Sequence, residues 1–299
     1  MTAPVLSLPP GTDFTHEVGD ANIDLDVCEA NDDIDGIILC TFTGYVDMST
    51  PGTYIVTYYA IDSAGNEAFL AVQHTVIDPD NPEAGLVLTE YYASASGLSG
   101  NALLLELRSI INTGMVKFSY GDSRYILNET DRDPNNPNNI ILIYLGTSVS
   151  GTWDDGVTWN REHVWPQSLM MTTSLSNTSK NIGSDLHNLK PANPNANSSR
   201  GNSHFDESLL ILGNPVRLEV RGDIARILFY MVVMYNYLEL INSTPSLYQM
   251  AMLDILIQWH EDDPVDDFER NRNNVIYSYQ HNRNPFIDFP HFVDLIYSP

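Results

Sequence analysis

Residues 160–168 read NREHVWPQS, residues 185–191 read DLHNLKP and residues 197–202 read NSSRGN. Together these stretches supply a carboxylate (Glu162), an imidazole (His163), an amide (Asn197) and a guanidinium (Arg200). Carboxylate and amide oxygens are ligands that Mg²⁺ or Ca²⁺ prefers. A histidine accepts a water proton near neutral pH, and an arginine binds two oxygens of a phosphate. The set predicts the cutting of a phosphodiester around one hard metal ion.

The spacing of these residues also restricts the local structure. Glu162 and His163 are adjacent, so on a regular strand their side chains would face opposite sides. At a strand end or in a loop both can reach one site. The adjacency excludes the His-Glu-x-x-His zinc helix, whose histidines lie four apart on one face. Pro191 and Pro194 interrupt regular structure, and a short helix is expected over residues 197–202. We therefore predict a strand, a loop, a strand and a helix around one ion.

The charge of the chain is unevenly distributed. The 299 residues carry 39 acidic and 14 basic side chains, a net charge of −25. Residues 1–85 contain no Lys or Arg and have a charge of −15, so the remainder has −10. A nucleic-acid enzyme usually has a basic footprint, and this balance argues against one. Because exposed charges are screened beyond about 8–10 Å in ordinary salt, we expect local arginines to decide contact. The acidic, lysine-poor composition is typical of a protein that works at high salt concentration, although a chance loss of lysines during evolution would give the same composition.

Length and patterning predict two folded modules. Residues 1–80 read as short strands separated by turns, clearest in the alternation over 52–61 and in a further strand at 68–77. This segment is predicted to be a small antiparallel sandwich. Residues 81–85, polar and proline-containing, are the predicted linker, and 86–299 form the second module.

The second module reads as α+β and mostly helical. We expect an amphipathic helix over 98–111, a buried strand over 139–144 and a helical tail from residue 221. The apolar stretch 224–240 is interrupted by polar and charged residues, which favours a buried helix over a membrane span.

The two cysteines, Cys28 and Cys40, both lie in the acidic segment. One disulfide in a secreted domain is favoured over two buried thiols, and the absence of Cys-x₂-Cys spacing argues against structural zinc. The N-terminal residues MTAPVLSLPP lack a basic region followed by an apolar stretch. Either the protein is not secreted by that route, or a signal peptide was removed and the initial Met added; we favour the second. The acidic run at residues 32–36 is interpreted as a solvated turn rather than a calcium loop.

Four linked motifs carry a resemblance to a known family, at residues 159–168, 185–192, 197–202 and 282–288. From about residue 86 to the end, the chain resembles the bacterial endonuclease I family, periplasmic and secreted non-specific nucleases of the ββα-metal (His-Me finger) class. The resemblance implies that His163 is the general base, that Glu162 and Asn197 bind the metal, and that Arg200 contacts the phosphate.

Three further residues of the motifs are candidate substrate-binding residues: Arg161, His187 and Asn188. For Arg161, phosphate contact and a local ion pair remain open. For His187 and Asn188, a supporting role is favoured over direct catalysis. Members of the family often carry several cysteines in the nuclease domain, and here there are none. Some members use an arginine between the first two motifs, where residues 169–184 offer only Lys180, so that role is not assigned.

The first module carries a resemblance of its own. Residues 46–54 and 62–66 resemble the bacterial immunoglobulin-like repeats of secreted and surface proteins, which implies an accessory or spacer role. The combined prediction is a secreted, monomeric, sequence-non-specific endonuclease that cuts DNA, with RNA as an alternative, and leaves 5′-phosphate ends. Mg²⁺ is the expected ion, with Ca²⁺ or Mn²⁺ as alternatives. The rival hypotheses are a surface adhesion or DNA-matrix protein with an inactive nuclease fold, and another metal hydrolase such as a phosphatase.

Overall fold

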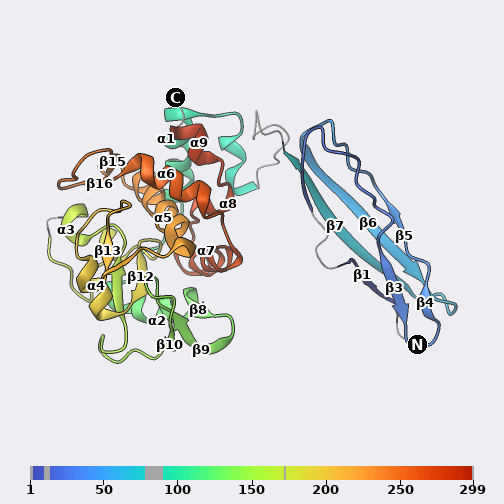
Figure 1. Ribbon diagram of the computed structural model, residues 1–299, viewed down its shortest axis with the longest axis horizontal. Coiled ribbons are helices and arrows are strands. Elements are labelled where there is room, and N and C mark those ends of the chain that lie inside the picture. The colour runs from blue at the N-terminus through green and yellow to red at the C-terminus, as the bar shows by residue number, and fades with distance from the viewer. Residues whose placement is uncertain (1–2, 10–13, 78–89, 172, 298–299) are drawn as a thin grey trace. The chain divides into compact units, whose positions relative to one another are not determined.

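The computed structural model describes residues 3–9, 14–77, 90–171 and 173–297. The chain separates into two units, Met1–Gly97 and Leu98–Pro299. The first is built of strands and the second mainly of helices (Figure 1). The predicted linker, residues 81–85, lies outside the described residues.

The first unit contains two sheets. One has the order β1 (Val5–Ser7), β3 (Glu29–Asp32), β4 (Gly36–Ile38), and the other has the order β2 (Thr15–Glu17), β7 (Glu67–Ile77), β6 (Gly52–Ile61), β5 (Thr41–Thr43). The sandwich is not wholly antiparallel as expected, because β2 pairs with β7 in parallel. The strands predicted at 52–61 and 68–77 correspond to β6 and β7. Val56, Tyr58 and Ala60 of β6 point into the core, whereas the alternate residues are mostly exposed, as the period of a half-buried strand requires.

The disulfide and the acidic turn both belong to this unit. Cys28 and Cys40 are joined, with their Cα atoms 5.8 Å apart, and Cys40 lies in the core. The Asp32 carboxylate accepts the backbone N–H groups of Ile34 and Asp35, which closes the turn between β3 and β4. Asp35 in turn accepts hydrogen bonds from Ser63.

The second unit begins after the short 3₁₀ helix η1 (Glu90–Ala95). Its first half contains α1 (Gly100–Asn112), α2 (Tyr120–Thr130), β8 (Arg132–Asp133), β9 (Asn136–Ile141), β10 (Ser148–Ser150), β11 (Asn160–His163), α3 (Gln167–Met170), η2 (Ile182–Ser184), β12 (Leu189–Ala192) and α4 (Pro194–Arg200). Its second half contains β13 (Leu210–Ile211), β14 (Asn214–Pro215), η3 (Leu218–Val220), α5 (Arg221–Met234), β15 (Glu239–Ile241), β16 (Gln249–Ala251), α6 (Leu253–Asp262), α7 (Asp267–Gln280), α8 (Pro285–Asp288) and α9 (Phe292–Tyr297).

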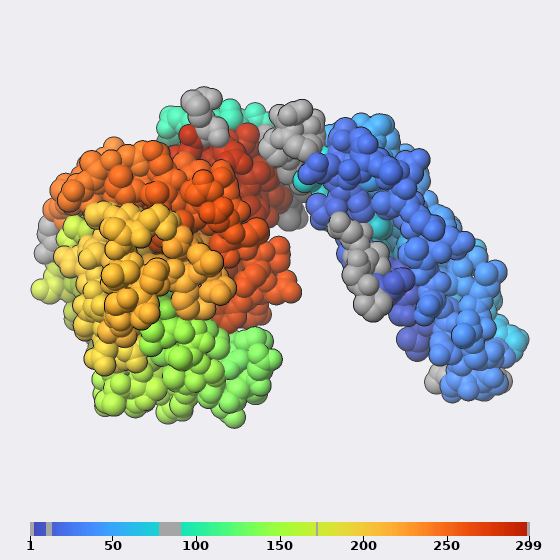
Figure 2. Space-filling view, viewed as in Figure 1, coloured from blue at the N-terminus to red at the C-terminus, as the bar shows by residue number. Residues whose placement is uncertain are grey.

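Helix α5 is the centre of the helical part. Residues 222–234 are all buried, and α5 packs against α1, α6 and α8. In Figure 2 the green segment of the second unit adjoins the yellow to red segments that follow it in the chain, in one continuous surface. The predicted buried helix over 224–240 is too long: α5 ends at Met234 because Tyr235 is extended and its hydroxyl donates to buried Asp185. Among the described residues no helix is long and apolar enough to cross a membrane.

The predicted strand over 139–144 is displaced. Strand β9 spans Asn136–Ile141, and Leu142 begins a turn in which its N–H donates to Thr147. Residues 142–144 nevertheless remain buried, as the apolar pattern indicated. The N–H of Ile143 donates to the carbonyl of Pro191 in β12, so this segment continues as a neighbour of β12.

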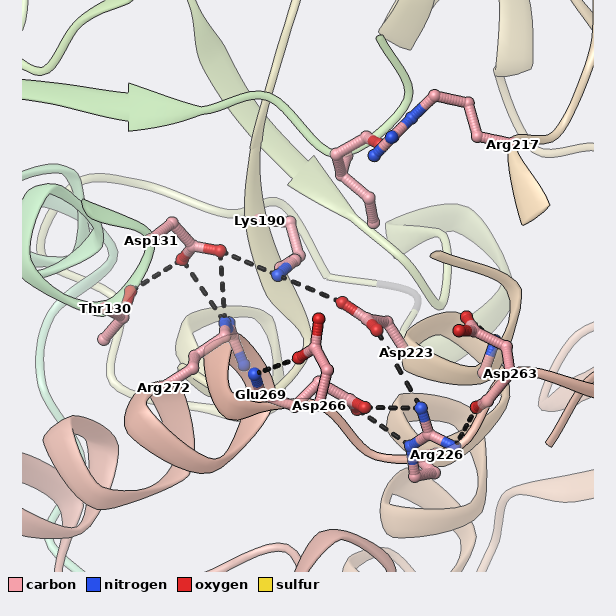
Figure 3. Close-up of polar contacts among 12 residues, drawn as sticks. Thr130, Asp131, Lys190, Arg217, Asp223, Arg226, Asp263, Asp266, Glu269 and Arg272 are labelled. Carbon is pink, nitrogen blue, oxygen red and sulfur yellow. Dashed lines mark hydrogen bonds and ion pairs between the residues drawn. The ribbon is translucent and has the colours of Figure 1, made fainter. Parts of the chain in front are cut away.

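A buried ionic network fixes β12 to the helices (Figure 3). Lys190 of β12 lies 2.8 Å from the Asp131 carboxylate and 3.8 Å from that of Asp223, which belongs to α5. Asp131 also binds Arg272 of α7. Burial acts to raise the pKa of Asp131, but Lys190 and Arg272 outweigh it and hold the pKa below its usual range. The position of β12 is therefore set by charge pairs removed from solvent.

Candidate active site

Strands β11 and β12 form an antiparallel pair in which Glu162 faces Lys190 and His163 faces Leu189. Helix α4 follows β12 directly, so the order strand, loop, strand, helix matches the prediction. The helix starts earlier than expected, at Pro194 rather than Asn197. Asn193 caps it by accepting the N–H groups of residues 195 and 196, and proline suits the first turn because its missing donor has no partner there.

One open pocket brings together most of the predicted residues. It is lined by Arg161, Glu162, His163, Pro166, Gln167, Ser168, Asn197, Gly201 and Asn202. The side chains from β11 and from α4 therefore reach the same space, although they are separated by a long stretch of chain. The adjacency of Glu162 and His163 poses no obstacle, because His163 is the last residue of its strand.

Glu162 is a buried carboxylate held by two donors. Its exposed fraction is 2%. The Tyr144 hydroxyl donates to Oε1 at 2.6 Å, and Arg200 Nη1 donates to the same oxygen at 3.0 Å. Burial raises the pKa of Glu162, while Arg200 and Tyr144 act to lower it. Both side-chain hydrogen bonds fall on Oε1, and the backbone N–H of His163 also acts to lower the pKa of this carboxylate.

His163 is fixed in one tautomer. Its Nε2 lies 2.8 Å from the carbonyl oxygen of Gly183, which can only accept, so Nε2 carries the proton and Nδ1 keeps a lone pair. The ring stacks on Tyr120 with centroids 5.4 Å apart. Burial, assisted by the positive charges of Arg161 and Arg200, lowers the pKa of His163 to about 4. The imidazole is therefore neutral and able to accept a proton at neutral pH.

Asn197 is oriented by its amide nitrogen. Nδ2 donates to Oδ1 of Asn160 at 2.8 Å and to the carbonyl of Arg161 at 3.4 Å. With the nitrogen committed to β11, Oδ1 is the atom that remains as an acceptor. The pocket thus combines two oxygen donors, on Glu162 and Asn197, with an imidazole acceptor.

Arg200 does not lie where the prediction placed it. Its exposed fraction is 1%, and it does not line the pocket. Besides binding Glu162, Nη1 donates to the carbonyl of His163 at 3.0 Å and Nη2 to that of Val164 at 2.6 Å. Its Cζ lies 4.4 Å from the centroid of the Phe205 ring. In this arrangement Arg200 supports Glu162 and the end of β11 from inside the protein.

Of the three candidate substrate-binding residues, only Arg161 reaches the pocket. Its guanidinium lies over the Tyr120 ring, 3.5 Å from the centroid, and donates to the Tyr120 carbonyl. No carboxylate of the described chain lies within ion-pair distance of it. His187 and Asn188 have no exposed surface. The Asn188 amide clamps the backbone N–H and carbonyl of Trp165, which shapes the chain after β11.

The sequence did not identify two residues of the site, Tyr144 and Gly183. Tyr144 appeared only as the end of a buried strand, and Gly183 carried no signal at all. Both act through contacts between segments distant in the sequence, on the Glu162 carboxylate and the His163 ring respectively. Neither contact has a local pattern that could have marked it.

The sequence model of the Endonuclease I family matches residues 99–210 and 214–291, and that of the bacterial surface protein Ig-like domain matches residues 6–76. Fold, site and family match together define a nuclease, an enzyme that hydrolyses phosphodiesters. The chain belongs to the endonuclease I family, and an immunoglobulin-like domain precedes its catalytic part. The predicted family and order of domains are thereby confirmed.

Curated relatives extend this result. The chain is 44% identical over 229 residues to the extracellular ribonuclease of Bacillus amyloliquefaciens, covering 69% of this chain and 78% of that protein. It is 43% identical over the same length to the extracellular ribonuclease of Bacillus subtilis (strain 168), with the same coverage. A lipoprotein structure from Bacteroides thetaiotaomicron is 23% identical over 25% of this chain and 39% of that chain, with a TM-score of 0.21, too low to support an argument.

Proposed function

We propose that this chain is an extracellular, divalent-metal-dependent endonuclease that cuts nucleic acids with little regard to sequence and uses His163 as its general base. One observation carries the proposal. The Gly183 carbonyl fixes the proton of His163 on Nε2, so Nδ1 is the acceptor, and Glu162 and Asn197 line the same pocket. Neither a phosphate-binding loop nor a nucleophilic side chain is needed for this chemistry.

The chemistry assigned to His163 follows from its state. A neutral imidazole whose Nδ1 is unprotonated can take the proton of a water molecule as that water attacks phosphorus in line. The Tyr120 ring keeps the imidazole plane fixed, and the Gly183 carbonyl stabilises the imidazolium that forms. Departure of the 3′ oxygen would leave a 5′-phosphate end.

The donor set fits a hard metal ion. The Glu162 carboxylate and Asn197 Oδ1 offer oxygen ligands at the same pocket. An ion bound by two protein oxygens would keep several water ligands, as Mg²⁺ usually does in proteins. Mg²⁺ is therefore the expected ion, with Ca²⁺ or Mn²⁺ as alternatives. When bound, such an ion would stabilise the negative charge that develops on the phosphoryl and leaving oxygens.

We assign different tasks to the two arginines. Arg200, buried against Glu162, acts against the rise in pKa that burial causes, holds the carboxylate in place, and is a positioning residue. Arg161 lines the pocket and has no carboxylate partner among the described residues, so we assign it the phosphate contact. Because phosphate contacts carry no sequence information, this arrangement supports cleavage at many sequences.

The names of the curated relatives support RNA as a substrate beside DNA, and support an extracellular location. The immunoglobulin-like domain, of a type named for bacterial surface proteins, supports the same location. We propose a monomer. The net charge of −10 on residues 86–299 repels nucleic acid at long range, so we expect activity to tolerate or need raised salt. A steady fall in activity from the lowest salt upward would contradict this expectation.

The proposal is tested with the full chain, plasmid DNA and RNA, in Mg²⁺ and in EDTA. Wild type should cut both in Mg²⁺ and neither in EDTA, and the product ends should ligate without prior phosphorylation. His163→Ala should reduce cleavage by at least about 100-fold, the lower range for a general base. The matched control is His281→Asn. His281 is exposed, its backbone has the left-handed conformation, and Asn adopts that conformation readily. Failure of wild type to cut either plasmid or RNA in Mg²⁺, or equal rates for His163→Ala, would defeat the proposal.

A further inference from the structure

A chain of cations and aromatic rings leads away from the pocket. The Arg161 guanidinium, which lines the pocket, lies 5.3 Å from the ring centroid of Trp153. On the same ring lies the guanidinium of Arg124, at 5.8 Å, and Arg124 also lies 5.0 Å from the ring of Tyr125. We call Arg161, Trp153, Arg124 and Tyr125 the arginine–aromatic strip. It joins β11, the loop after β10 and helix α2, and Figure 1 shows α2 and β10 at the same end of the second unit.

The strip is accessible, and its two arginines have no ion pair in the described chain. Tyr125 is 59% exposed, and the other three side chains are half-buried. In the described chain no carboxylate lies within ion-pair distance of Arg124 or Arg161, whereas most other basic residues of the second unit have such a partner. The strip therefore holds two guanidiniums that have no carboxylate partner in the described chain, and one of them lines the pocket.

Two nearby acids are not ion-paired with the strip in the described chain, although the Arg124 guanidinium attracts the Asp122 carboxylate and, beside the hydrogen bond from Ser119, helps to hold the pKa of Asp122 below its usual range. The Asp122 carboxylate is engaged with Ser119 in the capping box of α2. That of Asp154 accepts the backbone N–H groups of Val157 and Thr158. The strip also contains buried polar groups whose loss of water is not compensated by hydrogen bonds in the described structure. Arg124 Nε and Trp153 Nε1 are buried and, within the described structure, lack hydrogen-bond partners. Pure stabilisation of the fold would not favour that composition.

We propose that the arginine–aromatic strip binds an unpaired nucleotide of the substrate strand, next to the phosphodiester bond that is hydrolysed with His163 as general base. Arg161 and Arg124 hold successive phosphates, and the exposed ring of Tyr125 stacks on a base. The inference rests on the proposed function and specifies its substrate. Bases inside a duplex already stack on one another, so a site of this kind favours single strands and unpaired loops.

Binding is measured apart from catalysis. Fluorescently labelled 12-nucleotide single strands of RNA and of DNA, and a matched blunt duplex, are titrated against the full-length His163→Ala protein in Mg²⁺. Adding Tyr125→Ala should weaken binding of the single strands by about 5- to 150-fold, the range for one base stacked on one aromatic side chain, and change duplex binding little. Tyr125→Phe, which keeps the ring, should bind as the parent does.

Matched controls exclude a general loss of aromatic or positive surface. Tyr237, 48% exposed, serves as the control tyrosine for Tyr125→Ala. Arg270, exposed and paired with Asp267, serves as the control for Arg124→Gln. In the active enzyme, Tyr125→Ala and Arg124→Gln should raise KM for single strands and leave kcat within about twofold. The tryptophan-fluorescence unfolding transition should not move for either variant.

An abasic scan locates the contact. Each oligonucleotide lacks one base, and at one position the missing base should weaken binding to the parent protein but not to Tyr125→Ala. The inference is overturned if no position behaves in this way, or if Tyr125→Ala and Tyr237→Ala have equal effects. That outcome, with wild type still cutting nucleic acid, leaves the proposed function standing. Failure of wild type to cut any substrate would instead remove the proposed function.

Discussion

Replacing Arg200 by methionine separates two roles that an arginine at this place can have. The substitution keeps an unbranched side chain but removes the charged partner of Glu162, which is 2% exposed, and leaves the neutral Tyr144 hydroxyl as a side-chain donor. Removing one partner of a buried ion pair costs about 3–5 kcal/mol, because the remaining charge is uncompensated. We expect the free energy of unfolding of the second unit to fall by that amount at pH 7. An arginine that contacted only the phosphate would lower activity with little change in stability.

The measurement is urea unfolding followed by tryptophan fluorescence. All four tryptophans lie in the second unit, so the signal reports that unit alone. In Glu162→Gln/Arg200→Met the buried charge is gone, and the double variant should lose about 1–3 kcal/mol less than the sum of the single variants. Arg270→Met, which breaks an exposed pair with Asp267, should change stability by less than about 1 kcal/mol. A loss below about 1 kcal/mol for Arg200→Met, or strict additivity, would refute the reasoning.

Three other perturbations have definite expected results. Lys190→Met should destabilise the second unit by about 3–5 kcal/mol because it strips a buried carboxylate of one partner, whereas exposed Lys117→Met should be nearly neutral, and urea midpoints test both. Burial, with Arg226 nearby, lowers the pKa of His260 to about 4, below the unfolded value near 6.5. Between about pH 6.5 and pH 4 the unfolded chain therefore binds a proton at His260 that the folded protein does not, so the free energy of unfolding falls by up to about 1.4 kcal/mol per pH unit as the pH is lowered. The urea midpoint of His260→Gln should decline less steeply over this range than that of wild type. An equal slope would contradict this expectation. Reducing the Cys28–Cys40 disulfide should cost the first unit about 3 kcal/mol, seen as a lower midpoint by circular dichroism, while the tryptophan transition stays in place.

The fold was predictable where one buried face controls the pattern. Strand β6 coincides with the alternation at 52–61 because its inward residues meet one core and its outward residues meet water. Helix α5 shows the limit. Its apolar sequence continues to Leu240, but the helix stops at Met234 because the Tyr235 hydroxyl binds Asp185, far away in the chain. A contact of that kind has no signature in local periodicity.

The candidate site divides in the same way. The types and order of Glu162, His163 and Asn197 predicted a shared pocket, and the structure brings all three together. The position of Arg200 could not be predicted, because the sequence does not distinguish an arginine that contacts phosphate from one that pairs with a buried carboxylate. What decides between them is whether acceptors lie within reach, and here Glu162 and the carbonyls of residues 163 and 164 do.

The acidic charge of the chain and a nucleic-acid substrate are compatible because the two act over different distances. Net charge sets a repulsion that salt screens beyond about 8–10 Å, whereas contact is decided by side chains within hydrogen-bond distance of the strand. In the second unit many of the bases are committed inside the fold, as Lys190, Arg226 and Arg272 are in the network of Figure 3. Such bases offset buried acids and add nothing to the field at the surface. The guanidiniums of Arg161 and Arg124, which have no carboxylate within ion-pair distance in the described chain, lie at the pocket and beside it. The local field there therefore depends on a few residues and is not given by the total of −25.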